Sequence, residues 1–402
     1  MTRPTANPLT TALTGLVALA VAMGIGRFAF TPLLPMMLHD GSIDLQAGSW
    51  LASANYLGYW IGAVGCALQP WVWRRLWPGR GFAMGGALRL GLGLTVVLTL
   101  AMGLQLPGWW PTLRFCAGVA SALVFVYTSG WCLSRLAAAG APHLGGVVYM
   151  GPGLGIVTSG LSASAMVAGG VSAQVAWWVV GGLALVLTAV VWPRFTEPAV
   201  PVAAPVGGVA AKGVTAPAMV LVVAYGLAGF GYIISATFLP VIARQALPGS
   251  ALQDLFWPLF GLSVALGALL TTRLPARWDR RWLLVGCYSL QALGVVLAVW
   301  WPTLSGFALG SVLLGLPFTA ISLFAMQEAR RVVPHAAAAY MGLLTAAYGL
   351  GQIAGPALVV AILLRSADVS AGFALALETA AGALVLGVLL YGWLLSLGRG
   401  HN

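Results

Sequence analysis

The fold class is decided by residues 11–34, TALTGLVALAVAMGIGRFAFTPLL, which carry a single charge, that of Arg27. A helix needs about 20 mostly apolar residues to cross the hydrocarbon of a bilayer. Lipid offers no partner to backbone N–H and C=O groups, so a segment of this kind must be helical. The whole chain has the same character, because 60% of its 402 residues are hydrophobic and only 7% are charged, against about 25% in a soluble domain. We therefore interpret it as an all-α membrane protein.

Eleven further stretches resemble the first in length and apolar character. We predict twelve membrane-spanning helices, at residues 11–34, 47–70, 81–105, 109–133, 144–168, 173–193, 216–240, 253–272, 282–301, 303–325, 336–363 and 371–396. Prolines and glycines between the sixth and seventh spans indicate a loose linker. The predicted organisation is an N-terminal six-helix bundle (1–193), a cytoplasmic linker (194–215) and a C-terminal six-helix bundle (216–402).

The basic residues predict the orientation. If the N-terminus is cytoplasmic, 14 of the 19 arginines and lysines fall on the cytoplasmic side and only Arg244 and Arg365 on the other. This asymmetry is the positive-inside pattern of membrane proteins. It also explains the net charge of +11, so we expect no nucleic-acid partner. We predict a multi-pass protein of the inner (plasma) membrane with both termini in the cytoplasm.

The two halves of the chain repeat one another. A shift of 205 residues places Gly24 and Pro35 on Gly229 and Pro240, and a similar shift relates the fifth span to the eleventh. Parallel repeats of this kind place a binding site at their interface, near the midplane of the membrane. We therefore expect two pseudo-symmetric six-helix bundles with a site between them.

Several motifs resemble the major facilitator superfamily. The fifth span reads YMGPGLGIVTSG (Tyr149–Gly160), similar to the Gly- and Pro-rich motif of that family's fifth helix, and RFCAG (Arg114–Gly118) is similar to its Arg-x-x-Gln-Gly motif. The first span contains GIGRFAFTPLLPMM (Gly24–Met37), which resembles the YbfB/YjiJ-like branch. The resemblance implies a twelve-helix inner-membrane carrier that works by alternating access.

Three arginines, Arg27, Arg89 and Arg114, fall inside predicted spans, and Glu378 is the one carboxylate at comparable depth. A charge at the bilayer centre costs roughly 2.5–3.5 kcal/mol, so it normally faces a polar path or a partner. We predict that Arg27, with Thr31 one turn further on, binds an anionic or carbonyl-bearing group. The alternative is a structural arginine held by helix carbonyls or reaching the interface.

Arg114, Arg89 and Glu378 can each be interpreted as functional or as structural. By the resemblance, Arg114 is a candidate for substrate binding or proton movement, whereas its shallow depth favours an interfacial position. Arg89 belongs to no motif, so a structural role is favoured. A buried carboxyl such as Glu378 can carry a proton, which makes it the proton-coupling candidate. The alternative is an acid packed against small residues or an arginine.

Polar and aromatic side chains share helix faces with these charges. Asn55 and Tyr59 lie four residues apart, as do Tyr348 and Gln352, and Tyr232 aligns with Arg27 in the repeat. Such residues can hydrogen-bond a substrate beside one charged anchor. Alternatively, they join helices to one another, at about 0.6–2 kcal/mol per bond.

Two further groups of residues are candidates for conformational change. Glycines and prolines open and bend a helix, and the predicted hinge or gate positions are Gly151, Pro152, Gly153, Gly155, Gly355 and Pro356. The sequence RWDRR keeps the Asp-Arg pair of the family's cytoplasmic loop. Asp279 and Arg280 are therefore predicted to form a cytoplasmic latch, the alternative being a solvated loop.

Together these patterns predict a secondary active transporter for a small organic molecule, anionic or amphipathic, driven by a proton gradient or by the substrate's own gradient. No nucleotide-binding loop, cofactor motif or metal-ligand spacing occurs, so we predict no enzyme activity, no cofactor and no metal. We expect the chain to act as a monomer in contact with membrane lipid. The alternatives are a membrane enzyme acting on lipids and a sensor or scaffold that transports nothing.

Overall fold

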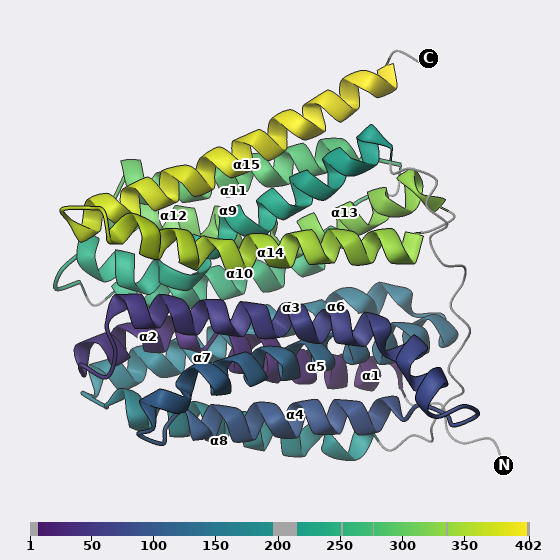
Figure 1. Cartoon of the computed structure of the whole chain (residues 1–402), viewed down its shortest axis with the longest axis horizontal. Helices are drawn as coiled ribbons and strands as arrows, with labels where there is room; N and C mark the ends of the chain where they lie inside the picture. The colour runs from purple at the N-terminus through teal and green to yellow at the C-terminus, as the bar shows by residue number, and fades with distance from the viewer. Residues whose placement is uncertain (1–6, 196–214, 251, 276, 335–336, 400–402) are drawn as a thin grey trace.

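The computed structural model describes residues 7–195, 215–250, 252–275, 277–334 and 337–399, and within these ranges the regular elements are all helical (Figure 1). The long helices of the first half are α1 (Pro8–Leu19), α2 (Phe30–His39), α3 (Leu45–Leu76), α4 (Met84–Ala101), α5 (Trp110–Ala138), α7 (Gly151–Ala168) and α8 (Ala173–Val191). Those of the second half are α9 (Ala216–Ala246), α10 (Phe256–Thr271), α11 (Arg280–Trp300), α12 (Leu304–Gly315), α13 (Phe318–Val332), α14 (Ala337–Leu363) and α15 (Val369–Arg399). The shorter pieces are η1 (Ala20–Arg27), η2 (Pro107–Trp109), η3 (Pro142–Leu144), α6 (Gly145–Tyr149), η4 (Trp192–Arg194) and η5 (Gln253–Leu255).

Eleven helices in the described ranges are long and apolar enough to cross a membrane, one fewer than the sequence predicts. The predicted second span, 47–70, is fully helical within α3, but α3 is not among the eleven. Its apolar residues are interrupted by Asn55, Tyr56 and Trp60. These side chains are tolerated because α3 packs between α5 and α14, where they meet protein groups instead of lipid.

The helices lie in two groups that follow the order of the chain. In Figure 1, α1–α8 lie together below and α9–α15 lie together above. Across the boundary, α3 packs against α14 and α7 packs against α10. Glycine permits the close approach of α7, because a Cβ on Gly153 would lie 2.5 Å from the backbone nitrogen of Ala265. The two groups are thus in close contact where α7 meets α10.

The first span is helical as predicted and extends over Pro8–His39, but it contains an irregular segment. Between α1 and α2 the chain widens into the π-helical segment η1, where the N–H of Phe28 donates to the carbonyl of Met23, 3.1 Å away. Wide turns of this kind release carbonyl groups for other partners and are frequent at functional sites. Here the hydroxyl of Ser121 on α5 donates to the carbonyl of Ala22 at 2.8 Å. The irregular segment is therefore supported from a neighbouring helix.

Two other spans are also divided. The fifth is interrupted at Met150, between α6 and α7, and the tenth at Pro317, between α12 and α13. Pro317 supplies no N–H and ends the first piece.

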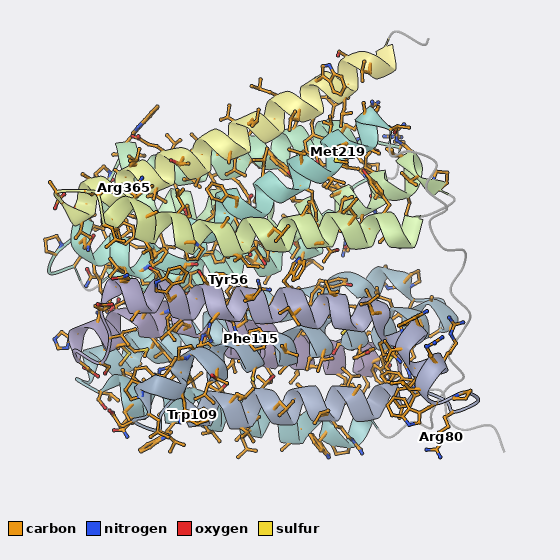
Figure 2. All side chains as sticks on the ribbon, in the orientation of Figure 1. Tyr56, Arg80, Trp109, Phe115, Met219 and Arg365 are labelled. Carbon is orange, nitrogen blue, oxygen red and sulfur yellow. The ribbon has the colours of Figure 1, made fainter. Side chains whose placement is uncertain are left out.

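Figure 2 places Arg80 at one end of the helices and Trp109 and Arg365 at the other. The predicted linker 194–215 falls almost wholly outside the described residues, which resume at Thr215.

Candidate functional site

Arg27 is the last residue of η1 and lies at the boundary between the two groups of helices. Its side chain is almost sealed, with 3% of the residue exposed. Nη2 donates to Oε1 of Gln352 on α14 at 2.7 Å, and the guanidinium carbon lies 3.8 Å from the centre of the Tyr59 ring, which is a cation–π distance. Within the described part of the chain, Nε has no hydrogen-bond partner. A buried guanidinium thus keeps an unused donor.

Gln352 continues this contact into a row of tyrosines. Its Nε2 donates to the hydroxyl of Tyr232 on α9. The ring of Tyr232 stacks on Tyr348 with centroids 5.8 Å apart, and Tyr348 stacks on Tyr225 at 4.7 Å. The Tyr225 hydroxyl donates to Ser322 on α13 at 2.9 Å. The guanidinium and the amide therefore lie at one end of an aromatic surface.

A second pair of hydrogen bonds joins the two groups of helices near Arg27. The hydroxyl of Thr31 on α2 donates to the carbonyl of Ala236 on α9 at 2.9 Å. The hydroxyls of Tyr56 and Thr237 lie 2.8 Å apart, and Figure 2 shows Tyr56 at this boundary. These are neutral hydrogen bonds of modest strength, each about 1 kcal/mol, so the contact can be broken and remade.

Arg114 is equally buried, with 2% exposed, but it faces backbone. Nη1 and Nη2 donate to the carbonyls of Gly26 and Arg27, at 3.3 and 3.2 Å. Asn55 lies behind it and donates from Nδ2 to the carbonyl of Arg114 at 2.9 Å. Because Gly26 and Arg27 end η1, Arg114 holds the turn that presents Arg27. The structure does not show it reaching the membrane interface.

Neither arginine is neutralised by a described acid. The described carboxylates that form ion pairs do so elsewhere, with His39, Arg244, Arg281 and Arg331. Glu378 is exposed on α15, on a helix whose exposed leucines include Leu375 and Leu389. Its exposed side chain is therefore not part of the buried cluster around Arg27. Two guanidinium groups without a counter-ion leave the interior of the described structure positively charged.

The predicted hinge residues lie at close helix contacts. A Cβ on Gly151 would meet the carbonyl of Leu16, and one on Gly155 would meet the backbone of Ala20 and Gly24. Pro152 opens α7 and Gly153 faces α10. In the second half, Gly355 packs against Ile233, and Pro356 lies inside α14. The break at Met150 adjoins the first of these contacts.

The predicted latch lies at the start of α11. Asp279 accepts from the backbone N–H of Arg281 at 2.9 Å and pairs with Arg281 Nη2 at 2.8 Å. Partial burial alone would raise the pKa of Asp279, but the hydrogen bonds and charge of Arg281 outweigh it and hold that pKa below its ordinary value. Arg281 also donates to the carbonyl of Leu394 on α15 at 2.7 Å. Arg280 instead stands over the ring of Phe324 at 5.6 Å.

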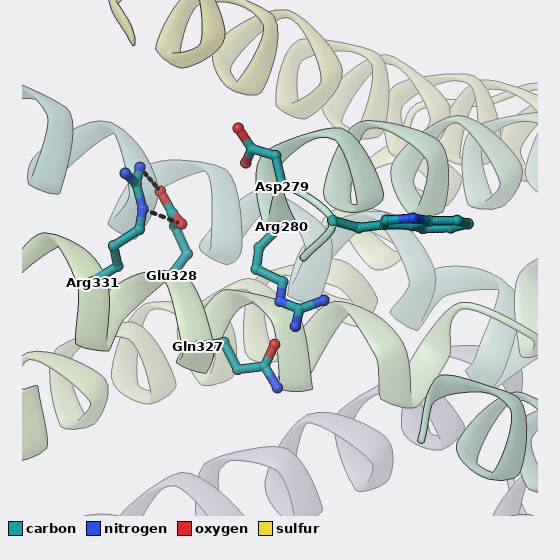
Figure 3. A pocket seen from close by; sticks show the side chains of 6 residues that line it. Asp279, Arg280, Gln327, Glu328 and Arg331 are labelled. Carbon is teal, nitrogen blue, oxygen red and sulfur yellow. Dashed lines mark hydrogen bonds and ion pairs between the residues drawn. The ribbon is translucent and has the colours of Figure 1, made fainter. Parts of the chain in front are cut away.

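An open pocket of about 370 Å³ lies beside this loop, lined by Asp279, Arg280 and residues of α13 (Figure 3). Glu328, 2% exposed, forms a bidentate pair with Arg331, 2.6 Å at its shorter contact. The sequence analysis missed Glu328 because the tenth span was predicted to end at 325. Its position one turn before Arg331 was the available signal.

Two tyrosines of the site were also missed. Tyr56 precedes Tyr59 by three residues, and Tyr225 precedes Tyr232 by seven. Both spacings return to the same face of a helix. The spacing was therefore a usable signal for the two side chains.

The comparisons with known proteins show the family of this chain. The family described as "Uncharacterised MFS-type transporter YbfB" matches residues 19–391. The chain belongs to this family. As an MFS-type transporter it is a multi-pass membrane protein that carries out transmembrane transport. Membership of such a family implies a small-molecule substrate. A comparison with curated proteins found no match.

Solved structures of two other transporters share the fold. The nucleoside transporter NupG matches with a TM-score of 0.66 and 14% identity, over 96% of this chain and 98% of that one. A bacterial homolog of the human lysosomal transporter Spinster, in an inward-facing and unoccupied conformation, matches with a TM-score of 0.65 and 13% identity, over 97% of each chain. At these identities the similarity concerns the fold alone.

Proposed function

We propose that this MFS-type transporter is a secondary active carrier for a small organic molecule with an anionic group and an apolar or aromatic body. The observation that carries the proposal is the guanidinium of Arg27, which is buried, unpaired by any described carboxylate and short of a partner at Nε. A carboxylate, sulfonate or phosphate supplies the charge-assisted acceptor that this donor lacks. The adjoining rings of Tyr59, Tyr232 and Tyr348 offer flat surfaces for the rest of the substrate.

The carrier would work by alternating access between two pseudo-symmetric six-helix bundles. The repeat supports this arrangement, because Thr31 and Ala236, which are joined by a hydrogen bond, are themselves related by the shift of 205. Two residues at equivalent positions of the repeat contact each other in this way only near the two-fold pseudo-axis that relates the two halves. The cluster around Arg27 draws residues from both halves, so a rocking motion would open and close it.

The expected setting is the inner (plasma) membrane, with both termini in the cytoplasm and the chain acting as a monomer. The excess of arginine at one end of the sequence-based topology supports the orientation. A proton gradient or the substrate's own gradient supplies the energy. In this proposal the polar groups around Arg27 bind and release a substrate without chemical change, so the chain is a carrier and not an enzyme.

The experiment has two stages. Purified protein is screened for thermal stabilisation by organic anions, because a ligand that binds the folded state raises its stability, and each hit is then tested for flux in proteoliposomes. We expect flux of an anionic hit and its loss in Arg27→Gln. Binding without flux would favour a sensor, and chemical conversion of the hit would favour an enzyme. Wild-type affinity in Arg27→Gln would remove the proposed anchor.

A further inference from the structure

A groove on the outer surface of the first half lies between α4 and α8. It holds about 420 Å³ and is lined mainly by apolar side chains, among them Val97, Leu185 and Trp192. Val97 and Leu185 are 60% and 52% exposed, so the groove opens outward, where the hydrocarbon of a membrane would meet it. A groove of this shape and chemistry fits an acyl chain.

Arg89 adjoins this groove through Trp192, which lines it at the end that is predicted to face the cytoplasm. Its Nε donates to the carbonyl of Trp192 at 3.2 Å, and its guanidinium carbon lies 5.6 Å from the Trp192 ring. No described carboxylate forms an ion pair with it. The hydrogen bond fixes one edge of the guanidinium and leaves its Nη donors for another acceptor. An anionic phospholipid has a charged phosphate, an interfacial glycerol region and apolar acyl chains. The arginine, the tryptophan and the apolar groove can contact these three parts in that order.

Thr188 supplies a second, independent observation. It lines the groove, is 4% exposed, and its hydroxyl has no partner within the described part of the chain. Two other buried helix threonines, Thr95 and Thr99, donate to the carbonyl four residues earlier. A hydroxyl in this position lacks an acceptor, and hydrocarbon has none. Thr188 lies one helical turn before Trp192, the residue that Arg89 contacts, and the ester carbonyls of a phospholipid likewise lie just below its phosphate.

We propose that the α4–α8 groove is a binding site for one anionic phospholipid of the surrounding membrane, with the phosphate on Arg89, an ester carbonyl at Thr188 and an acyl chain along Val97 and Leu185. The site lies apart from the Arg27 cluster and does not depend on transport. It gives Arg89, which has no place in the proposed carrier mechanism, a function of its own.

The test is native mass spectrometry of the full chain in detergent, offered equal amounts of dioleoyl phosphatidylglycerol and dioleoyl phosphatidylcholine. We expect one phosphatidylglycerol to be retained at least fivefold in excess over phosphatidylcholine. Arg89→Gln removes the charged contact and should abolish this preference, a loss of about tenfold in affinity. Gly93→Leu should reduce retention of both lipids, because Gly93 lines the groove and a Cβ there meets nothing closer than 3.8 Å. Arg80→Gln, an exposed loop arginine, is the matched control and should behave as wild type.

Three outcomes would overturn the site. Equal retention of the two lipids by the wild type would remove the headgroup selectivity. An equal loss in Arg80→Gln and Arg89→Gln would mean that general surface charge holds the lipid. Displacement of the lipid by a comparable amount of glycerol phosphate, which has no acyl chains, would show that the groove contributes nothing. Because the wild-type comparison needs no variant, the proposal stays testable even where Arg89→Gln fails to fold.

Discussion

The guanidinium of Arg27 donates to the side-chain oxygen of Gln352 over 2.7 Å, joining two residues that lie 325 positions apart in the chain. The partner is an amide and not a carboxylate, so the positive charge is oriented but not neutralised. This difference matters because a carboxylate at the same place would already satisfy the arginine. The anionic substrate proposed above would then compete with a neutral oxygen instead of with a full charge.

Gln352→Glu should therefore inhibit the carrier. The new carboxylate would pair with Arg27, and an anionic ligand would have to displace it. A hydrogen bond to a charged group contributes about 1.5–3 kcal/mol, so we expect affinity for the anion to fall by a factor of about ten or more. Ligand titrations that follow thermal stability measure this effect. Gln352→Met, which has similar length and no charge, is the control and should lose less affinity, and equal losses in the two variants would contradict the competition.

Arg114→Gln should lower stability and transport rate together. Its two donors hold the carbonyls of Gly26 and Arg27 at the end of η1, and their loss leaves buried backbone oxygens without a partner, at about 1–3 kcal/mol. Because the guanidinium contacts backbone and not the proposed substrate, the order of preference among anionic ligands should be unchanged. Uptake measurements with several ligands separate the two roles. A change of preference would show that Arg114 touches the substrate itself.

Gly155→Ala should destabilise the first half of the protein. Its new Cβ would press on the backbone of Ala20 and Gly24 in η1, and over-packing of this kind costs about 1–3 kcal/mol. Melting temperature in detergent measures the loss. Gly182→Ala, on α8, is the matched control, because no heavy atom outside its own helix lies within 4 Å of the added carbon. Equal melting temperatures for the two variants would mean that the η1–α7 contact is looser than the structure shows.

Much of the fold was accessible from the sequence because lipid restricts what an apolar segment can do. The predicted spans coincide with helices, and the family resemblance is confirmed by the match over residues 19–391. The residues around Arg27 were accessible for a related reason. A cation buried in an apolar helix needs polar neighbours, and the repeat pointed to Tyr232 while helix spacing paired Tyr348 with Gln352.

The sequence did not predict how each helix is rotated about its own axis, and so which neighbour each side chain faces. Asn55 and Tyr59 share a face in sequence, yet Asn55 contacts the backbone of α5 while Tyr59 contacts Arg27. The π-helical turn of η1 shifts the following side chains by a fraction of a turn, and no local propensity encodes that shift. The depth of Glu378 in the membrane could be predicted from the sequence, because depth can be counted along a helix. The sequence did not show which face of α15 is exposed, because the helices that pack against α15 decide this.

Glu378→Gln tests the proton-coupling candidate. The carboxylate is exposed on α15 and no described residue pairs with it, so we expect the variant to keep both substrate exchange and uptake driven by a pH gradient. Proteoliposomes with and without an imposed gradient distinguish the two activities. Loss of gradient-driven uptake with exchange preserved would instead identify Glu378 as the coupling group, as its depth in the sequence suggests.

Thr31→Val tests whether the hydrogen bonds between the two halves set the balance of conformations. Valine keeps the shape of threonine but cannot donate to the carbonyl of Ala236, and a bond between membrane helices contributes about 0.6–2 kcal/mol. We expect this end of the boundary to open more often, so that hydrogen exchange in α2 and α9 increases while α4 and α8 stay unchanged. Tyr56→Phe removes the neighbouring bond to Thr237 and should act in the same direction. If exchange in α2 and α9 is unaffected in both variants, these bonds only follow the packing of the helices, and the barrier to opening lies elsewhere along the contact of α7 with α10.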